Sequence, residues 1–171
     1  MQIKVNQLRN MIPTLECGSR ILLSGTVYTA RDAAHKKILS LIKNGEPLPF
    51  HIENSVIYYA GPTQTPPGLP IGSCGPTTSS RMDIFAPTLL DLGLCAMIGK
   101  GPRNQAVVDA IVRNKAIYLC SLGGAGALAA RCITSCEVVA FDELGCESIK
   151  KLQFKDFPLI VGIDCYGKSI F

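Results

Sequence analysis

The sequence predicts a single α/β domain. Apolar runs of strand length alternate along the chain with segments whose apolar residues recur at helical spacing, which is the pattern of a sheet flanked by helices. The chain has 171 residues, and its 47% hydrophobic content is enough for one core of its own. No repeat, low-complexity tract or change in composition marks a boundary. We therefore expect residues 1–171 to form one unit.

The first half of the chain contains the clearest elements. Residues 21–28 are expected to form a strand, and Asp32–Lys43 a helix that stops at Asn44-Gly45. Ser55–Ala60 has the composition of a second strand. Residues 61–76 hold five prolines and four glycines, so they form a loop. A loop of this length inside a compact domain is usually functional or mobile.

The second half continues the alternation. We expect a helix to begin near Thr78 or Ser79, which are both good N-terminal caps, and to break or kink at Pro87. The remaining expected elements are a strand at Cys95–Ile98, a helix that starts at Pro102 and turns Ala106, Val107, Ala110 and Ile111 inward, a strand at 116–121, a helix at 125–131, a strand at 137–141, a short helical piece at 143–151 and a last strand at 158–164.

Charge and composition exclude several classes of function. Seventeen Lys and Arg stand against thirteen Asp and Glu, a mild excess of +4 that is not gathered into the basic run of a nucleic-acid-binding arm. Small anions are the expected ligands. The first twenty residues contain four charges and no continuous apolar stretch, so we expect neither a signal peptide nor a membrane span, and a cytoplasmic protein.

Eight cysteines would fit a disulfide framework only in an oxidising compartment, which the absence of an export signal does not favour. There is no C-x-x-C pair, and the two histidines, His35 and His51, lie far from the cysteines in sequence. We therefore expect no metal site built by this chain alone. Most cysteines are interpreted as small apolar residues, whereas Cys74 borders a polar loop and is expected to be accessible.

The segment most suggestive of chemistry runs from Gly75 to Asp83 and is followed by Ile98-Gly-Lys-Gly101. It concentrates hydroxyls, a guanidinium and an ammonium, but no carboxylate, imidazole or thiolate trio that could run a reaction alone. Thr77 and Arg81 are four residues apart at an expected helix N-terminus, where free N–H groups favour an anion. Lys100 follows one strand, and Arg31 lies where another strand meets a helix. The pattern is typical of half an active site.

These residues carry a resemblance to a known family. The motifs Gly75-Pro-Thr-Thr-Ser-Ser-Arg-Met-Asp83, Met97-Ile-Gly-Lys-Gly101, Thr29-Ala-Arg-Asp-Ala-Ala-His35 and Gly123-Gly-Ala-Gly-Ala-Leu128 resemble the β subunit of the iron–sulfur hydro-lyases that comprise class I fumarases and L-tartrate dehydratases. The similarity extends from Leu22 to Lys168. It implies a swivelling β/β/α domain with a mixed sheet and flanking helices.

The resemblance also implies an activity and a partner. It points to a β subunit that hydrates fumarate to L-malate, or alternatively dehydrates L-tartrate, only together with an α subunit in an α2β2 assembly. Three cysteines of that α subunit would hold a [4Fe–4S] cluster, which would act as a Lewis acid on the departing hydroxyl of a small dicarboxylate. Residue by residue, the family's substrate-binding cations fall on Arg31, Arg81 and Lys100, and its active threonine on Thr77.

The chemistry of dehydration explains these residue types. Arg81 can hold a carboxylate bidentately and stabilise the charge it gains when the neighbouring carbon loses a proton, while Arg31 and Lys100 complete the positive wall. A threonine hydroxyl is a very weak base, so Thr77 can transfer a proton only if nearby cations lower its pKa or a carboxylate takes the proton onward.

Structural alternatives remain for each residue. The hydroxyls from Thr77 to Ser80 could serve only as helix caps, Lys100 as a turn residue and Arg31 as a solvated residue at a helix start. His35 is interpreted as a packed residue, and Asp32 and Asp83 either orient nearby arginines or lie on helix surfaces. The whole chain could also be a non-catalytic assembly or anion-binding module. Finally, Gly124–Ala129 with Asp142 matches a dinucleotide fingerprint weakly.

Overall fold

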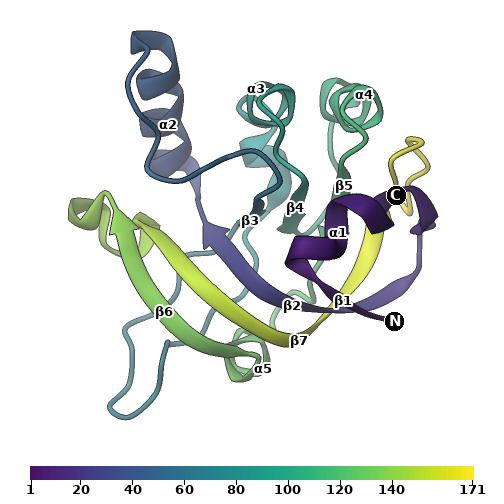
Figure 1. Ribbon diagram of the computed structural model, residues 1–171. Helices are drawn as coiled ribbons and strands as arrows, with labels where there is room; N and C mark the ends of the chain where they lie inside the picture. The colour runs from purple at the N-terminus through teal and green to yellow at the C-terminus, as the bar shows by residue number, and fades with distance from the viewer.

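The computed structural model describes all 171 residues and contains one seven-stranded sheet in the order β1-β2-β3-β4-β5-β7-β6. Because β7 also pairs with β2, five of the strands close into a barrel, with β1 and β6 added beside it (Figure 1). The strands are β1 (Gln2–Lys4), β2 (Arg20–Thr29), β3 (Val56–Tyr58), β4 (Ala96–Gly99), β5 (Ile117–Cys120), β6 (Ile133–Ala140) and β7 (Ile149–Ile163).

The sheet is mixed, as the family resemblance implies. Strands β2, β3, β4 and β5 are parallel to their neighbours, whereas β7 runs antiparallel to β5, β2 and β6. The carboxyl ends of the four parallel strands therefore meet at one end of the barrel. Residues that directly follow these strands are brought together even where they are far apart in the chain.

The helices gather mainly on one side. Figure 1 shows α2, α3 and α4 side by side along the sheet, with α5 near the other end and the loop after β3 projecting at the lower left. The helices are α1 (Val5–Met11), α2 (Asp32–Asn44), α3 (Ala86–Asp91), α4 (Gln105–Arg113) and α5 (Gly126–Arg131), with 3₁₀ turns η1 (Ile12–Thr14), η2 (Ser79–Met82) and η3 (Asp142–Glu147). None of them combines the length and hydropathy that a membrane-spanning helix requires.

The central strands are buried on both faces. Along β3, Val56 and Tyr58 pack inside the barrel, whereas Ile57 packs against the helices. Ile117 and Leu119 of β5 point inward in the same way, and Tyr118 points toward the helical layer. Two apolar layers on either side of one sheet explain why these strands are continuous apolar runs rather than alternating ones.

Local sequence signals place several boundaries correctly. Helix α2 ends at Gly45, which adopts the left-handed conformation with φ 67° and closes the last turn by donating its N–H to Ile42 and Leu41 carbonyls. Helix α4 begins after Asn104, whose side chain accepts the N–H of Val107 at 3.0 Å. The strands expected at 21–28, 55–60, 95–98 and 116–121 and the helix at 125–131 are confirmed within a few residues.

Several expectations are wrong. Only the short 3₁₀ turn η2 follows Thr78, which makes no side-chain cap, and Pro87 lies in the first turn of a separate helix, α3. Helix α4 starts at Gln105 rather than Pro102, and Ala106 faces solvent. Residues 77–84 do not form an α-helix because the N–H groups of Thr77 and Ser79 are bonded to the Tyr59 and Lys100 carbonyls of other segments.

The last strand is far longer than residues 158–164. It begins at Ile149, so residues 149–151 are extended rather than helical, and β6 begins at Ile133 rather than 137. Within β7, Asp156 has φ 50° and Pro158 cannot donate a hydrogen bond, which interrupts the strand signal in the sequence. The strand β1 and helix α1 at the N-terminal end are additional elements that the sequence analysis did not predict.

Cys74 is not accessible. It lies in the barrel core with no exposed surface, and the hydroxyl of the buried Tyr58 donates a hydrogen bond to its carbonyl at 2.8 Å. Burial raises the pKa of the Cys74 thiol to about 12. The end of the proline-rich loop is thus anchored in the core, although residues 63–70 are exposed.

Candidate functional site

The candidate residues follow the parallel strands at their shared carboxyl end. Arg31 comes two residues after β2, and Lys100 comes directly after β4. The segment that carries Thr77 lies across these ends, because the Thr77 N–H donates to the Tyr59 carbonyl at 2.7 Å and Thr78 pairs with Lys100 as an isolated parallel bridge. Segments distant in sequence therefore converge here.

Ser79 locks this crossing segment to the end of β4. Its backbone N–H donates to the Lys100 carbonyl at 3.0 Å, and its side-chain oxygen accepts the Lys100 N–H at 3.0 Å. A side chain at Gly99 would place its Cβ 1.9 Å from the Ser79 oxygen, so only glycine fits there. This pair of bonds holds the backbones of Thr77 and Lys100 in one fixed arrangement.

Arg81 is held by Asp32. The Arg81 Nε donates to Asp32 Oδ1 at 3.1 Å. The Arg81 Nη2 lies 3.0 Å from Asp32 Oδ2, which makes an ion pair but not a well-aligned hydrogen bond. The contact joins the start of α2 to η2. Asp32 therefore has the orienting contact that was one of its two expected roles. About half of the Arg81 side chain remains exposed, so the guanidinium can still meet a ligand.

Arg31 is packed against backbone rather than strongly paired. Its Nε lies 3.5 Å from Glu147 Oε1, which is too long for a good hydrogen bond. Its guanidinium lies against Gly61, where a Cβ would come within 2.4 Å of Nη1. The Lys150 ammonium holds the 3₁₀ turn that carries Glu147, because it donates to the Gly145 carbonyl of that turn at 2.9 Å and to Ser148 Oγ, just after it, at 2.6 Å. Burial lowers the pKa of Lys150.

Lys100 is the cation of this group without a carboxylate partner. Arg31 and Arg81 are compensated by Glu147 and Asp32, so three cations and two carboxylates leave one net positive charge. The aliphatic stem of Lys100 lies over Gly123, where an added Cβ would be 3.4 Å from Cδ. The group therefore attracts an anion less strongly than the three free cations expected from the sequence would. Lys100 exerts the strongest attraction.

The Thr77 hydroxyl makes no hydrogen bond within the chain, while its backbone is fixed through Tyr59. It is therefore free to contact a ligand. None of the five principal cavities is lined by Thr77 or by the three candidate cations. Arg81 is exposed and the other three side chains are partly exposed, so all four reach the surface of the chain.

A buried ion pair between Arg103 and Asp83 also lies in this region. An arginine partner was one of the two expected roles of Asp83, but Arg103 was not among the candidate residues. The Arg103 side chain is fully buried, and its Nε donates to Asp83 Oδ1 at 2.6 Å. The guanidinium packs 5.3 Å from the Tyr59 ring centre and 5.0 Å from that of Tyr118. Asp83 also accepts the Asn104 N–H at 2.7 Å. Nothing in the sequence distinguishes Arg103 from an ordinary surface arginine.

Tyr118 connects this ion pair to the crossing segment. Its hydroxyl oxygen lies 2.9 Å from both the Gly101 carbonyl and Ser79 Oγ. A carbonyl can only accept and the phenol has one proton, so Tyr118 donates to Gly101 and accepts the proton of Ser79. Ser79 in turn accepts from the Lys100 N–H. Each of these hydroxyls thus donates one hydrogen bond and accepts one. Burial raises the pKa of Tyr118 far above its usual value.

His35 is a packed residue, as expected. It is fully buried, stacked on Phe85 and edge-on to Tyr59, with ring centres 5.5 Å apart in each case. Nδ1 lies 2.8 Å from the Arg31 carbonyl, so Nδ1 carries the proton and Nε2 is a buried acceptor without a partner. Burial is the main cause that lowers the pKa of His35 to about 4.

In the dinucleotide-like pattern, Gly126 has a packing explanation, and Gly124 adopts a left-handed backbone with φ 76°. A Cβ at Gly126 would lie 2.4 Å from Ser73 Oγ and 3.0 Å from the Gly75 nitrogen. The Cys74 N–H donates to the Gly126 carbonyl at 3.0 Å. Two backbones approach each other closely here, and α5 is only six residues long.

The chain offers no ligand set for an iron–sulfur cluster. All eight cysteines are free thiols, and nowhere do three or more His, Cys, Asp or Glu side chains gather so that they could hold a metal ion. Cys146 is the exposed one, and it lies in the turn that carries Glu147. A cluster of the kind that the family resemblance implies does not fit the residues present.

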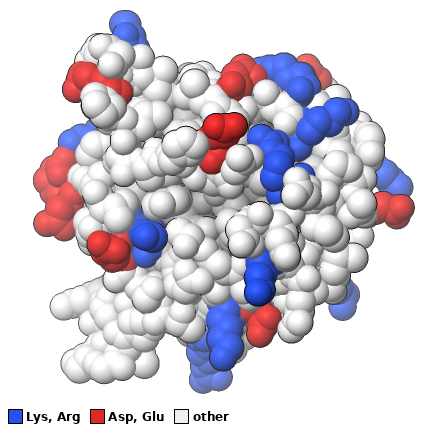
Figure 2. Space-filling view, in the orientation of Figure 1, with Lys and Arg blue, Asp and Glu red and all other residues white.

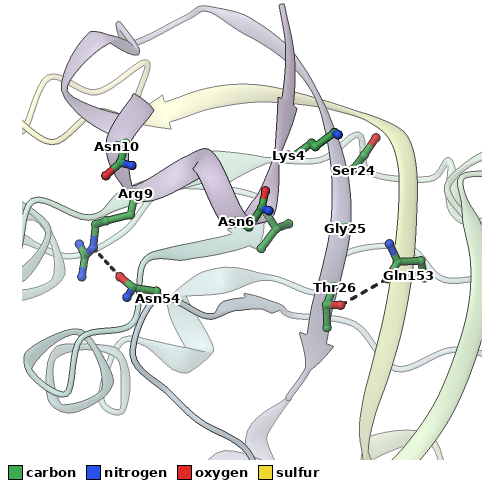
Figure 3. Close-up of a pocket in the computed structure, with 10 residues that line it drawn as sticks. Lys4, Asn6, Arg9, Asn10, Ser24, Gly25, Thr26, Asn54 and Gln153 are labelled. Carbon is green, nitrogen blue, oxygen red and sulfur yellow. Dashed lines mark hydrogen bonds between the residues drawn. The ribbon is translucent and has the colours of Figure 1, made fainter.

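The largest of the principal cavities, about 620 Å³, lies elsewhere, between α1 and β2 (Figure 3). Its most prominent charge, Arg9, is already engaged, because it donates to Asn54 Oδ1 at 3.0 Å and to the Gly93 carbonyl at 3.1 Å. Figure 2 shows Lys and Arg scattered over the visible face, with the densest group at the upper right, where Asp and Glu lie among them. Neither feature competes with the carboxyl-end group as a site for chemistry.

Comparisons with known proteins bear on the same residues. A family model described as Fumarase C-terminus matches residues 1–171. The chain is 44% identical over 155 residues to the anaerobic class I fumarate hydratase of Escherichia coli (strain K12), which covers 90% of this chain and 28% of that protein. It is 38% identical over 169 residues to fumarate hydratase 2 of Leishmania major, which covers 98% of this chain and 30% of that protein.

A relative of matching length also exists. The chain is 36% identical over 178 residues to a protein of Methanocaldococcus jannaschii named as an L(+)-tartrate dehydratase subunit beta, and the alignment covers 100% of this chain and 91% of that protein. The chain thus spans about 30% of the length of the fumarate hydratases it matches, but nearly all of this smaller subunit.

Proposed function

The chain belongs to the Fumarase C-terminus family, and from this membership we propose that it is the small subunit of an iron–sulfur-dependent hydro-lyase. The reaction we propose is the reversible hydration of fumarate to L-malate. Class I fumarate hydratases are among its relatives at 44% identity, and this supports the choice. The remaining two thirds of such an enzyme would come from an α subunit, in a cytoplasmic α2β2 complex.

The observation that carries this proposal is the convergence of the candidate residues at one barrel end. The Ser79–Lys100 bonds and the Arg81–Asp32 ion pair join the crossing segment to the ends of β4 and β2. An anion placed above this end would meet Lys100, which has no competing carboxylate. The unpartnered Thr77 hydroxyl belongs to the same segment.

Each residue then has a distinct part. Arg81, oriented by Asp32, binds one carboxylate of the substrate and stabilises the extra negative charge on it in the transition state. Arg31 and Lys100 bind the carboxylates and fix the dicarboxylate's orientation. Thr77 delivers or removes the proton at the carbon beside the carboxylate held by Arg81. The cations nearby favour the ionised form of this hydroxyl.

The cluster belongs to the partner in this proposal, because this chain lacks ligands for it. When bound there, it would supply Lewis-acid chemistry at the hydroxyl-bearing carbon. The residues of this chain bind and orient the substrate and move the proton.

L-tartrate dehydration is the second candidate. The relative from Methanocaldococcus jannaschii has nearly the same length as this chain, and its name assigns it to a tartrate dehydratase as a separate β subunit. The two substrates differ in hydroxyl groups whose binding partners can lie on the other subunit. The same cationic group would serve both dicarboxylates.

Anaerobic assays of this chain with its α subunit test the proposal. We expect neither subunit alone to be active and the mixture to hydrate fumarate, monitored by the loss of absorbance of the double bond. A higher kcat/KM for L-tartrate would select the second candidate. A complex that turns over neither dicarboxylate would favour a non-catalytic assembly module, and full activity of this chain alone would refute the two-subunit site.

A further inference from the structure

An apolar groove lies beside the candidate site. Two cavities of about 410 and 300 Å³ share Leu122 and Pro158 in their linings, and most of the residues around them are apolar. Leu122 is 62% exposed, and Leu128 of α5 is 61% exposed. Single exposed leucines are ordinary, but two of them on one apolar groove are typical of an interaction surface. We call these two cavities together the apolar groove.

The groove continues directly into the candidate site. Leu122 precedes Gly123, whose backbone lies against the Lys100 side chain. The neighbouring Ser121 N–H donates to the Gly99 carbonyl at 2.9 Å, so the start of this turn is fixed to the end of β4. Any molecule that covers Leu122 therefore lies next to Lys100.

The groove is also lined by two uncompensated cations. Arg20 lines one cavity and Arg131 the other, both are exposed, and neither guanidinium forms an ion pair or a hydrogen bond within the chain. An occupant with an apolar ridge and flanking carboxylates would match this surface. A second copy would bring the same concave groove and the same two cations together, which complements neither shape nor charge.

We propose that the apolar groove docks the larger polypeptide of the hydro-lyase, the part that this chain lacks relative to the fumarate hydratases. In those relatives about 70% of the length lies outside the region that matches this chain. This inference rests on the proposed function, because it needs a partner that must face Lys100 and Thr77. Docking through Leu122 and Leu128 places the partner beside the end of β4, where the cations are.

The test measures association rather than turnover. The larger subunit from the same genome is immobilised, and the dissociation constant of this chain is measured by biolayer interferometry under anaerobic conditions. Leu122→Asp with Leu128→Asp is expected to weaken binding by at least about 30-fold, as for interface positions that contribute strongly. Arg20→Glu with Arg131→Glu is expected to weaken it and to reduce its dependence on salt.

Leu92→Asp is the matched control. Leu92 is also an exposed leucine, but it follows α3 and precedes β4, so it lies toward the opposite end of the parallel strands. Its substitution is expected to change binding by less than about threefold, as for positions outside an interface. All changed side chains are exposed, so unaltered circular dichroism and melting temperature will establish that each variant folds.

Unweakened binding by the Leu122/Leu128 variant would overturn the inference, as would a failure of the unmodified chain to bind the larger subunit. The inference would also be overturned if sedimentation equilibrium showed that this chain forms a dimer and that the Leu122/Leu128 substitutions dissociate it. A complex that depends on the groove but turns over no dicarboxylate would refute the proposed function and leave the docking surface intact. The two failures are thereby distinguishable.

Discussion

Ser79 and Lys100 hold each other through two reciprocal hydrogen bonds, both 3.0 Å long. One uses the serine N–H and the lysine carbonyl, and the other uses the lysine N–H and the serine side-chain oxygen. The pair connects positions 21 residues apart, where a short turn lies across the end of a barrel strand. The geometry of the proposed site depends on this connection more than on any helix.

The Ser79–Lys100 hydrogen bonds predict that any side chain at Gly99 destabilises the fold. Gly99→Ala would force a methyl group into Ser79 Oγ, and we expect a loss of about 1–3 kcal/mol in the free energy of unfolding, measured with urea. Gly123→Ala is the control, since its methyl group would lie at ordinary contact distance and should cost less than about 0.5 kcal/mol. If Ser79→Ala in the Gly99→Ala background fails to restore stability beyond additivity, the clash is not the cause.

The buried Arg103–Asp83 pair predicts a large loss of stability. Arg103→Ala leaves Asp83 buried without its cation, and we expect unfolding free energy to fall by about 3–5 kcal/mol. Arg113→Ala, which removes the exposed partner of Asp91, should have a much smaller effect, because solvent screens an exposed ion pair. Equal effects of the two substitutions in chemical unfolding would disprove the role assigned to burial.

His35 predicts a pH dependence with a definite sign. The pKa of its buried ring is about 4 in the folded chain and about 6.5 when unfolded, so the unfolded state binds more protons between these values. The contribution of His35 to the free energy of unfolding is fully present above pH 6.5 and is lost as the pH falls toward 4. The loss is about 3 kcal/mol. His35→Phe should flatten this part of the stability curve, measured as the free energy of unfolding between pH 4 and pH 7. Parallel curves for the unmodified and substituted proteins would contradict the interpretation.

Thiol labelling should separate the cysteines. Cys146 is exposed and is expected to react rapidly with a disulfide reagent, whereas Cys74 and Cys95 are buried and have raised pKa values. Cys146→Ser should remove the fastest phase. Rapid labelling of Cys74 in the native protein would mean that the end of the proline-rich loop leaves the core.

The sequence predicted what depends on local rules. Apolar runs identified β2 to β5 because these strands are buried on both faces, and Gly45 marked the end of α2 through its backbone freedom. The positions after parallel strands drew attention to Arg31 and Lys100. What failed depends on distant contacts: β7 extends to Ile149 because it pairs with β2, β5 and β6, and the closure of the barrel has no local signature.

The site was predictable only in part for the same reason. The polar segment, its threonine and Asp32 as a candidate partner of an arginine were visible in the sequence, but the supporting residues Tyr118, Arg103 and Glu147 were not. Tyr118 and Arg103 act through packing across the sheet, and Glu147 reaches Arg31 from a turn 116 positions later in the chain. The carboxylates beside Arg31 and Arg81 reduce the net charge of the group, which composition alone cannot reveal.

The most direct test of the account is the turnover of fumarate by the complex of this chain with its α subunit after substitution of Arg81 or Thr77. Arg81→Met and Thr77→Ala are each expected to lower kcat by about 100-fold or more, because each removes a group used in the transition state. The controls are Arg113→Met, an aspartate-paired arginine of nearly equal exposure, and Thr78→Ala, the exposed neighbouring threonine. Both controls should retain nearly full activity. Unchanged kcat and KM in the Arg81 and Thr77 variants would contradict the claim that this chain supplies half of the active site.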